Sequence, residues 1–368
     1  MAAIKPFLWI LTTGLNFGEY YKLPDETQFY RFLSSTKTSV IENIHHSLNK
    51  ELLEKEIISL SHFLIDSKPV MAATRNNNFK NPKRNIRNKH KIPKRNPQAT
   101  LGYYSYQEIN CKKENYIFFW GYRTHVICSK EGIPLVSCIL PNKFTDVKVA
   151  YKLIKKLKRV YRFKKGAIFI ADAAYDERDF YTFIVNEMKA HAFIPINPRN
   201  QQHPKTFGPH GCPLCDAGIE MKSAGSWTEG NRDRLKFRCP LKADSSIAKK
   251  YPDGCPINKL CFAEDTAYGC TKYLDVTDDA RARVPRDSLL YKETYSLRTE
   301  VERYFSRLGE REAEQTTHYK LKIVKNQMAI AHLSMSLVAN AAGILMNQPD
   351  KIRCFRTFAK DYQFPLVA

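Results

Sequence analysis

The segment Tyr291–Glu312, YKETYSLRTEVERYFSRLGERE, constrains the fold most, because one helix drawn through it has two faces of different character. At about 100° per residue, Tyr295, Arg298 and Glu302 fall on one stripe. A neighbouring apolar stripe must pack on a core, and it consists of Leu297, Val301, Tyr304, Phe305 and Leu308. Glu302 thus lies at the edge of a packed surface, where a carboxylate is either a metal ligand or an ordinary surface charge.

The charge of the chain indicates its partner. Among 368 residues the formal net charge is +22, and 43% of the residues are apolar, which is enough for a substantial core. A positive field of this size attracts phosphates, so nucleic acid is the first expected partner and an anionic membrane surface the second. Met328–Met346 is long enough to span a bilayer, but His332 and Asn340 within it favour a buried core helix, so no membrane partner is expected.

The cysteines and the N-terminal residues indicate the compartment. Phe7–Leu15 is apolar but lacks the cleavage pattern of a secretory signal. Ten cysteines without such a signal point to a reducing cytoplasm, where clustered thiols more often bind metal than form disulfides.

Residues 1–60 are predicted to be mostly helical. Asp25 or Thr27 caps a segment that runs through Leu33, and Thr38–Ser59 has apolar residues near helical spacing. This region is either a small DNA-contacting module or a support for the core.

Residues 67–107 form a basic segment. It contains no acidic residue and is rich in Asn and Pro, so we expect a mobile arm that contacts phosphates, with a solvated linker as the alternative. Its cations are Lys68, Arg75, Lys80, Lys83, Arg84, Arg87, Lys89, Lys91, Lys94 and Arg95.

The first part of the core reads as strands. His62–Asp66 is a short strand ending in Asp66, and Asn115–Ser129 and Ile133–Leu140 form an antiparallel hairpin around a turn at residues 130–132. Asp146 then caps a helix with one apolar face.

The next elements alternate between strand and helix. Ala167–Ala171 has the pattern of a strand buried on both faces, and it ends at Asp172. A helix over residues 177–189, which Asp176 caps, and a strand at Ala192–Ile196 follow. Reactive groups of open sheets gather beyond the carboxyl ends of central strands, which is where Asp66 and Asp172 are expected.

Three acids therefore have placements that could converge: Asp66, Asp172 and Glu302. Crowded carboxylates repel one another unless cations neutralise them, and hard divalent ions with oxygen ligands do so. Two such ions suit phosphodiester cleavage and strand transfer.

The motifs carry a family resemblance. The order of segments, IDSKPV at Asp66, ADAAYD at Asp172 and the spacing of Tyr295, Arg298 and Glu302 resemble the DDE transposases of bacterial insertion sequences, in the branch with a tyrosine, arginine, glutamate and lysine signature. The resemblance implies an RNase H-like α/β fold, with a mixed sheet flanked by helices. The core would comprise residues 61–200 and 291–350, an insertion residues 201–290 and a tail residues 351–368.

The resemblance also implies roles. Asp66, Asp172 and Glu302 would bind two Mg²⁺ or Mn²⁺ ions, and Tyr295 and Arg298 would contact phosphate near the cleaved end. The partner would be double-stranded DNA, both the terminal repeats of the element and its target, and a homodimer is expected when two ends are paired.

The chain departs from the family signature at Gly309, where the signature has its lysine. Either Arg307 or Arg311 replaces that phosphate contact, or the protein is a catalytically inactive DNA-binding relative. A related RNase H-like nuclease without strand transfer is the third alternative.

The insertion has a different composition, rich in Cys, Gly, Pro and charges. Its Cys-Pro-Leu-Cys motif suits a structural zinc, and the predicted ligands are Cys212, Cys215, Cys239 and Cys255, with unligated thiols as the alternative. Leu235, Phe237 and Cys239 alternate as on a strand, so the cations between them lie on its other face, where DNA contact is expected.

Overall fold

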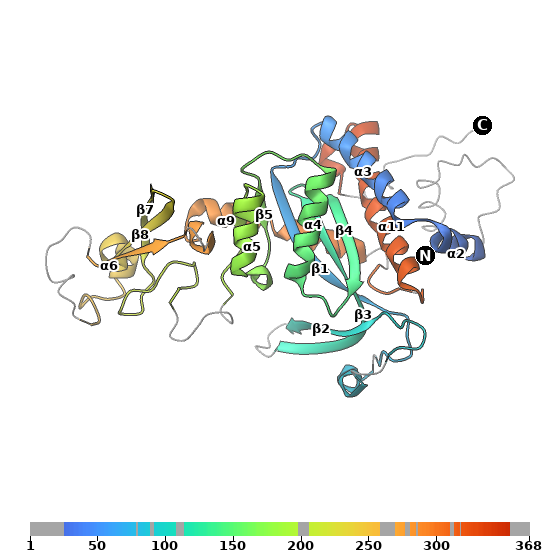
Figure 1. Ribbon diagram of the computed structural model, residues 1–368, viewed down its shortest axis with the longest axis horizontal. Helices are drawn as coiled ribbons and strands as arrows, with labels where there is room; N and C mark the ends of the chain where they lie inside the picture. The colour runs from blue at the N-terminus through green and yellow to red at the C-terminus, as the bar shows by residue number, and fades with distance from the viewer. Residues whose placement is uncertain are drawn as a thin grey trace. The chain divides into compact units, whose positions relative to one another are not determined.

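The computed structural model describes residues 26–353, apart from residues 79, 89–91, 108–113, 198–205, 258–268, 277–279, 285, 310–312 and 317. The protein is mixed α/β and divides into two compact units (Figure 1). Unit 1 comprises residues 1–163 and 299–368, and unit 2 comprises residues 164–298.

The sheet of unit 1 is antiparallel. Its long strand β3 (Glu114–Ser129) pairs with β1 (His62–Met71), with β2 (Thr100–Gln107) and with β4 (Pro134–Pro141). The predicted hairpin is confirmed, with Gly132 at a φ of 74° in the turn between β3 and β4. The first strand runs five residues past Asp66, so Asp66 lies inside β1 rather than at its end.

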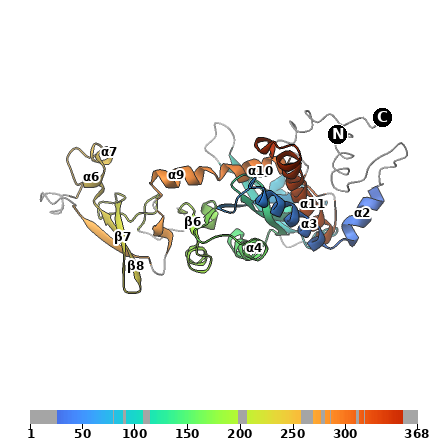
Figure 2. The same ribbon diagram turned by 90° about the horizontal axis from the view of Figure 1, so that it is seen from above.

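The two faces of this sheet carry different helices. Opposite residues of β1 and β3 share a face, and Lys68 faces the same side as Thr124, while Ser67 faces the other side with His125. The helix α4 (Asp146–Val160) lies on the Ser67 face, and α10 (Thr299–Gly309) and α11 (Leu321–Asn340) lie on the Lys68 face (Figure 2).

The N-terminal helices support the core in the part of the chain that the structure describes. Ile41 of α3 (Thr38–Glu54) packs on Ala329 and Leu333 of α11. The Asn326 amide of α11 donates 2.8 Å hydrogen bonds to the carbonyls of Leu33 and Thr36, at the end of α2 (Glu26–Ser35). These contacts confirm the predicted helices, while DNA contact by this region stays untested.

The helix α11 continues as the π-helical turn η6 (Ala341–Leu345). Together they are long and apolar enough to cross a membrane, with a mean hydropathy of 1.6, yet 61% of that stretch is buried inside the protein. A core helix of a soluble protein passes the same test, and the packing on α3 agrees with the predicted core helix.

The basic segment is anchored to the sheet, so the prediction of a mobile arm over residues 67–107 is wrong for its described parts. It contains β2 and the 3₁₀ helix η1 (Pro82–Asn88). Three buried asparagines bind backbone groups that no strand pairs. Asn77 bonds both the N–H and the carbonyl of Trp120, Asn85 donates to the Phe118 carbonyl, and Asn96 donates to the Ala73 carbonyl.

The core of unit 2 is small. Its strands β5 (Ile168–Ile170) and β6 (His191–Phe193) pair in parallel. Between them come the 3₁₀ turn η2 (Ala173–Tyr175), the helix α5 (Arg178–Thr182) and the π-helical turn η3 (Phe183–Glu187). Asp176 does not cap α5, because Glu177 holds that position; its carboxylate accepts a 2.8 Å hydrogen bond from the Asn197 N–H.

The insertion folds around a second, antiparallel sheet of β7 (Lys222–Glu229), β8 (Arg232–Arg238) and β9 (Thr271–Asp275). The predicted strand through Leu235 and Phe237 is confirmed as β8. Short helices α6 (Pro240–Ala243), α7 (Ser245–Ala248) and η5 (Ala280–Arg283) complete it, and η7 (Pro349–Lys351) ends the described chain in unit 1.

The helix predicted over Tyr291–Glu312 is two helices. The first, α9 (Leu289–Ser296), ends before a turn at Leu297 and Arg298, and α10 begins at Thr299. The N–H groups of Leu297 and Arg298 bond three residues back, to Thr294 and Tyr295, which tightens the helix end. The boundary between the two units falls directly after Arg298.

Candidate active site

Asp66 lies on the sheet face that α10 covers. It is two residues from Lys68 on β1, so both side chains point to that face. The Lys68 ammonium donates a 3.1 Å hydrogen bond to the carbonyl of Phe305 in α10. Asp66 is half-buried, and its carboxylate accepts a 2.7 Å hydrogen bond from the Ser67 N–H.

Glu302 lies on α10, which contacts β1, the strand that carries Asp66. The chain from α10 onward follows β1 in the same direction, because Phe305 contacts Lys68 and Glu314 then bonds the N–H of Met71. Glu302 comes about one helical turn before Phe305 on α10, and Asp66 comes two residues before Lys68 on β1. Its side chain is exposed, while Val301, Tyr304, Phe305 and Leu308 are buried as predicted.

An uncharged chain of hydrogen bonds fixes α10. The Tyr304 hydroxyl contacts His332 Nδ1 on α11, and the other nitrogen of that imidazole lies 3.2 Å from the Thr124 hydroxyl on β3. Burial lowers the pKa of His332 to about 3, so the ring is neutral at physiological pH. The residue two positions after Glu302 is therefore tied both to a second helix and to the sheet.

Asp146 belongs to the opposite face. Thr145 takes the cap position of α4 and Asp146 is the first helical residue, so the predicted cap is displaced by one residue. The Asp146 carboxylate accepts a 3.1 Å hydrogen bond from the Ser67 hydroxyl and pairs with Arg123 at 3.5 Å. These contacts, together with His125 at 3.6 Å, assign it a structural role.

In unit 2, Asp172 follows β5 directly. It is half-buried, and its Oδ1 accepts a 2.9 Å hydrogen bond from the Ala174 N–H, which caps η2. Because β5 and β6 are parallel, Asp172 stands at the same edge where β6 ends at Phe193.

Tyr295 is connected to that edge by a stack of three rings. Phe193 and Tyr291 lie with ring centroids 5.4 Å apart and planes 8° from parallel, and Tyr291 and Tyr295 lie 5.5 Å apart at 6°. Tyr295 is therefore linked through Tyr291 to the last residue of β6, and Asp172 follows the neighbouring strand β5. Arg298 follows one turn after Tyr295 and is half-buried.

A buried arginine fixes the start of α9. Arg286 is 3% exposed; its guanidinium donates to the Ile194 carbonyl at 2.7 Å and to the Tyr181 hydroxyl at 2.8 Å. Two residues later the Ser288 hydroxyl accepts a 3.1 Å hydrogen bond from the Tyr291 N–H and caps the helix. Arg286 thus joins the start of α9 to α5 and to the residue that follows β6.

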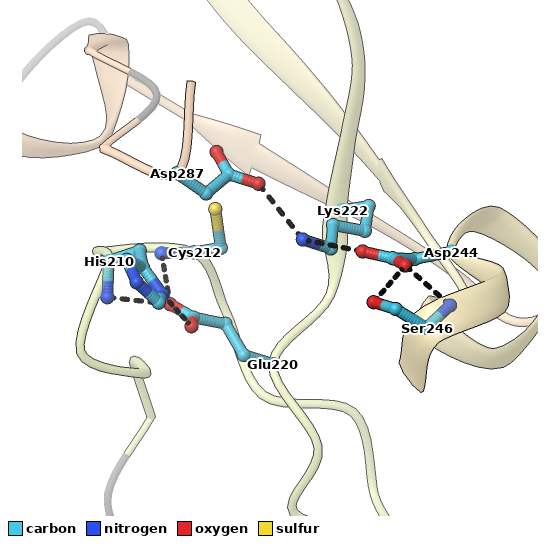
Figure 3. A network of polar contacts seen from close by, with 7 residues as sticks. All are labelled: His210, Cys212, Glu220, Lys222, Asp244, Ser246 and Asp287. Carbon is cyan, nitrogen blue, oxygen red and sulfur yellow. Dashed lines mark hydrogen bonds and ion pairs between the residues drawn. The ribbon is translucent and has the colours of Figure 1, made fainter. Parts of the chain in front are cut away.

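The insertion is attached to the same point (Figure 3). Lys222 of β7 lies between Asp244, at 3.2 Å, and Asp287, at 3.3 Å. In the preceding loop, Glu220 accepts hydrogen bonds from both the backbone and the imidazole of His210. Residues 286–288 are therefore held by the small core on one side and by the insertion on the other.

The cysteines pack around an apolar cluster. Cys212 lies with Met221 and Phe237, and Cys215 and Cys270 pack against them. Burial, followed by the nearby Asp287 and Glu220 carboxylates, raises the pKa of Cys212 to about 12. Among the described residues, no three His, Cys, Asp or Glu side chains are grouped closely enough to hold a metal ion. Zinc on Cys212, Cys215, Cys239 and Cys255 therefore stays a prediction, and Cys270, which is not among the predicted ligands, packs against the same apolar cluster as Cys212 and Cys215.

The cations predicted to contact DNA are exposed where the structure describes their side chains: Lys80, Lys83, Arg84, Lys94 and Arg95. Arg95 stacks over the Tyr319 ring at 5.1 Å, and Arg87 lies in η1 with its side chain outside the described set. Arg307 donates a 3.0 Å hydrogen bond to the Gly132 carbonyl, and Arg311 is outside the described residues.

Sequence reasoning missed three residues that shape these sites. Lys68 was counted only among the cations of the basic segment, although its position two residues after Asp66 could have indicated a shared face. His332 was noted only as a polar residue in an apolar helix, and Arg286 is one cation among many in the insertion. For the last two, the sequence gives no signal of burial.

One comparison with known proteins identifies a family. The model of the transposase DDE domain matches residues 59–337, which is more than half of the chain. No curated protein and no solved structure gives a significant match. The matched range includes Asp66, Asp172 and Glu302, and on this evidence the chain belongs to the transposase DDE domain family.

Proposed function

We propose that the protein cuts and joins DNA at the ends of an insertion sequence, with Asp66, Asp172 and Glu302 as its metal-binding carboxylates. The observation that supports the proposal is the contact between α10, which carries Glu302, and β1, which carries Asp66. In unit 2, Asp172 follows β5, and Tyr295 is linked through Tyr291 to Phe193 of the neighbouring strand β6. Family membership supports transposition as the process.

The chemistry of the donor set suits divalent ions. Carboxylate oxygens are the ligands that Mg²⁺ and Mn²⁺ prefer, and the three acids would hold two such ions. When bound, the ions supply an activated water or 3′ hydroxyl and stabilise the leaving oxygen. The contribution of the chain is to orient the DNA: the Arg298 guanidinium and the Tyr295 hydroxyl would hold phosphate oxygens near the cleaved bond.

The test is cleavage of duplex DNA taken from the sequence that flanks the gene. Asp172→Asn should lower the cleavage rate by roughly 10³-fold or more, because a lost metal ligand removes several kcal/mol of transition-state stabilisation. DNA affinity should stay within about threefold, since no phosphate contact is removed. Asp179→Asn, an exposed acid on α5, is the matched control and should cleave normally.

A catalytically inactive DNA-binding relative is the second candidate, and Gly309 in place of the signature lysine favours it. Cleavage by the wild-type protein with Mn²⁺ would exclude it, and its absence under conditions of tight binding would support it. A supplied 3′ hydroxyl end that is cut but never joined would instead indicate a nuclease.

A further inference from the structure

The space beside Gly309 holds the ammonium of another residue. A Cβ atom on Gly309 would lie 3.6 Å from the Lys68 ammonium. Gly309 is seven residues after Glu302, which is close to two helical turns, so both positions belong to one stripe of α10. A cation from β1 therefore stands beside the helix position where the family signature has a lysine.

We propose that Lys68 takes the place of that lysine and binds a phosphate oxygen of the DNA next to the carboxylates. The inference rests on the proposed function, because it assigns a DNA contact to the same site. The Lys68 ammonium reaches the Glu302 stripe of α10 from β1, whereas the signature lysine would belong to α10 itself. Asp66 and Lys68 then act from one face of β1, with Asp66 on the metal and Lys68 on the substrate.

The Lys68 ammonium has capacity for this contact. An ammonium has three N–H donors, and in the described residues two acceptors engage it, the Phe305 carbonyl and the Glu314 carboxylate. The side chain is 26% exposed and Glu314 is 49% exposed, so solvent reaches the pair. A surface ion pair of this kind contributes little to stability, so a phosphate can compete for the ammonium.

The other described candidate is committed elsewhere. Arg307 points to the turn between β3 and β4, where it donates to the Gly132 carbonyl. Burial lowers the pKa of Arg307. The Lys68 ammonium instead lies beside Gly309, on the stripe of α10 that contains Glu302.

A purely structural role would also explain the contacts of Lys68, because a cation stabilises the C-terminal end of a helix. The two roles predict different results for Lys68→Gln. Glutamine can still donate to the Phe305 carbonyl, so a structural tie is largely kept, whereas a charge contact with phosphate is lost.

The experiment measures DNA affinity of the full chain against salt, by fluorescence anisotropy of a labelled duplex from the sequence flanking the gene. Lys68→Gln should lower the slope of log affinity against log salt by about 0.9, the value for one phosphate contact. Lys68→Gln combined with Gly309→Lys should restore it. The new side chain displaces only the end of the flexible Glu314 side chain, which lies 2.5 Å from the added Cβ.

Lys55→Ala, which removes an exposed lysine after α3, is the control for general loss of charge. Circular dichroism and thermal unfolding establish that each variant is folded. An unchanged slope in folded Lys68→Gln, no recovery on adding Gly309→Lys, or wild-type protein that does not bind the duplex would each overturn the proposal. Cleavage is scored separately: if the slope behaves as expected and no variant cleaves, the Lys68 contact stands and the proposed catalysis fails.

Discussion

In unit 1 the buried anchor of the helix that carries Glu302 is a chain of uncharged groups, whereas in unit 2 the buried anchor of the helix that carries Tyr295 is a guanidinium. Tyr304, His332 and Thr124 form the first anchor, inside a sheet whose strands run from eight to sixteen residues. Arg286 forms the second, beside two strands of three residues each.

The difference follows from how much apolar surface each unit can bury. Long strands covered by helices on both faces provide a core in which a neutral hydrogen-bond chain adds specificity. The parallel pair of unit 2 buries little, so one side chain with five N–H donors connects several backbone segments instead. The two anchors should therefore respond differently to mutation and to pH.

The largest effect is expected at Arg286. Arg286→Met removes the N–H groups that the Tyr181 hydroxyl and the Arg281 carbonyl accept, at a cost of roughly 3 kcal/mol, while the Ile194 carbonyl keeps the Tyr181 hydroxyl as a donor. Hydrogen exchange measured by mass spectrometry should show faster exchange in α9 than in α10. Arg232→Met, at a side chain 65% exposed on β8, is the control and should change stability by less than about 0.5 kcal/mol. Equal exchange in both helices would contradict the separate anchors.

A smaller loss is expected at Tyr304. Tyr304→Phe leaves the buried His332 Nδ1 without its partner and should cost about 1 to 2 kcal/mol, because the ring and its packing stay. Urea unfolding measures the loss, and faster exchange should appear in α10 rather than in α9. Tyr273→Phe, at an exposed ring on β9, should be neutral. A neutral Tyr304→Phe would show that the contact between Tyr304 and His332 does not hold α10 in place.

The sequence predicted some of this and missed the rest for physical reasons. The stripe of Val301, Tyr304 and Leu308 depends only on helical period, so it could be read and is buried as predicted. The break at Leu297 and Arg298 has no Gly or Pro to mark it. The asparagines of the basic segment looked like solvated residues, because side-chain bonds to a distant backbone leave no periodic pattern.

Acidification should weaken the anchor in unit 1 more than the anchor in unit 2. Burial lowers the pKa of His332 to about 3, and it lowers the pKa values of His46 and His125 to about 4. These groups bind protons in the unfolded chain below about pH 6.5 but not in the folded one, so stability is present above that pH and is lost as pH falls.

Each of these histidines should contribute a loss of about 1 kcal/mol between pH 7.5 and 5.5. Urea midpoints at several pH values measure this loss. His332→Gln should reduce the slope of the unfolding free energy against pH by the amount that corresponds to about one bound proton. All three histidines lie in unit 1, so exchange in α10 should rise at low pH more than exchange in α9. A slope that is the same in His332→Gln and wild type would mean that His332 is not the group that titrates.

The smallest effect tests whether the ring stack positions Tyr295. Phe193→Leu keeps an apolar side chain at the end of β6 but removes the stacking partner of Tyr291, a loss of about 1 kcal/mol. Phe183→Leu is the matched control, because Phe183 stacks on Phe180 with ring centroids 6.4 Å apart in the same unit. Both should lower stability by similar amounts, but only Phe193→Leu should weaken DNA binding, by about two- to fivefold, since a less ordered Tyr295 must be fixed on binding. Equal affinities for the two variants would mean that α9 positions Tyr295 without help from the ring stack on Phe193. The contacts of Arg286 with Ile194 and Tyr181 would then be what ties α9 to β6 and α5.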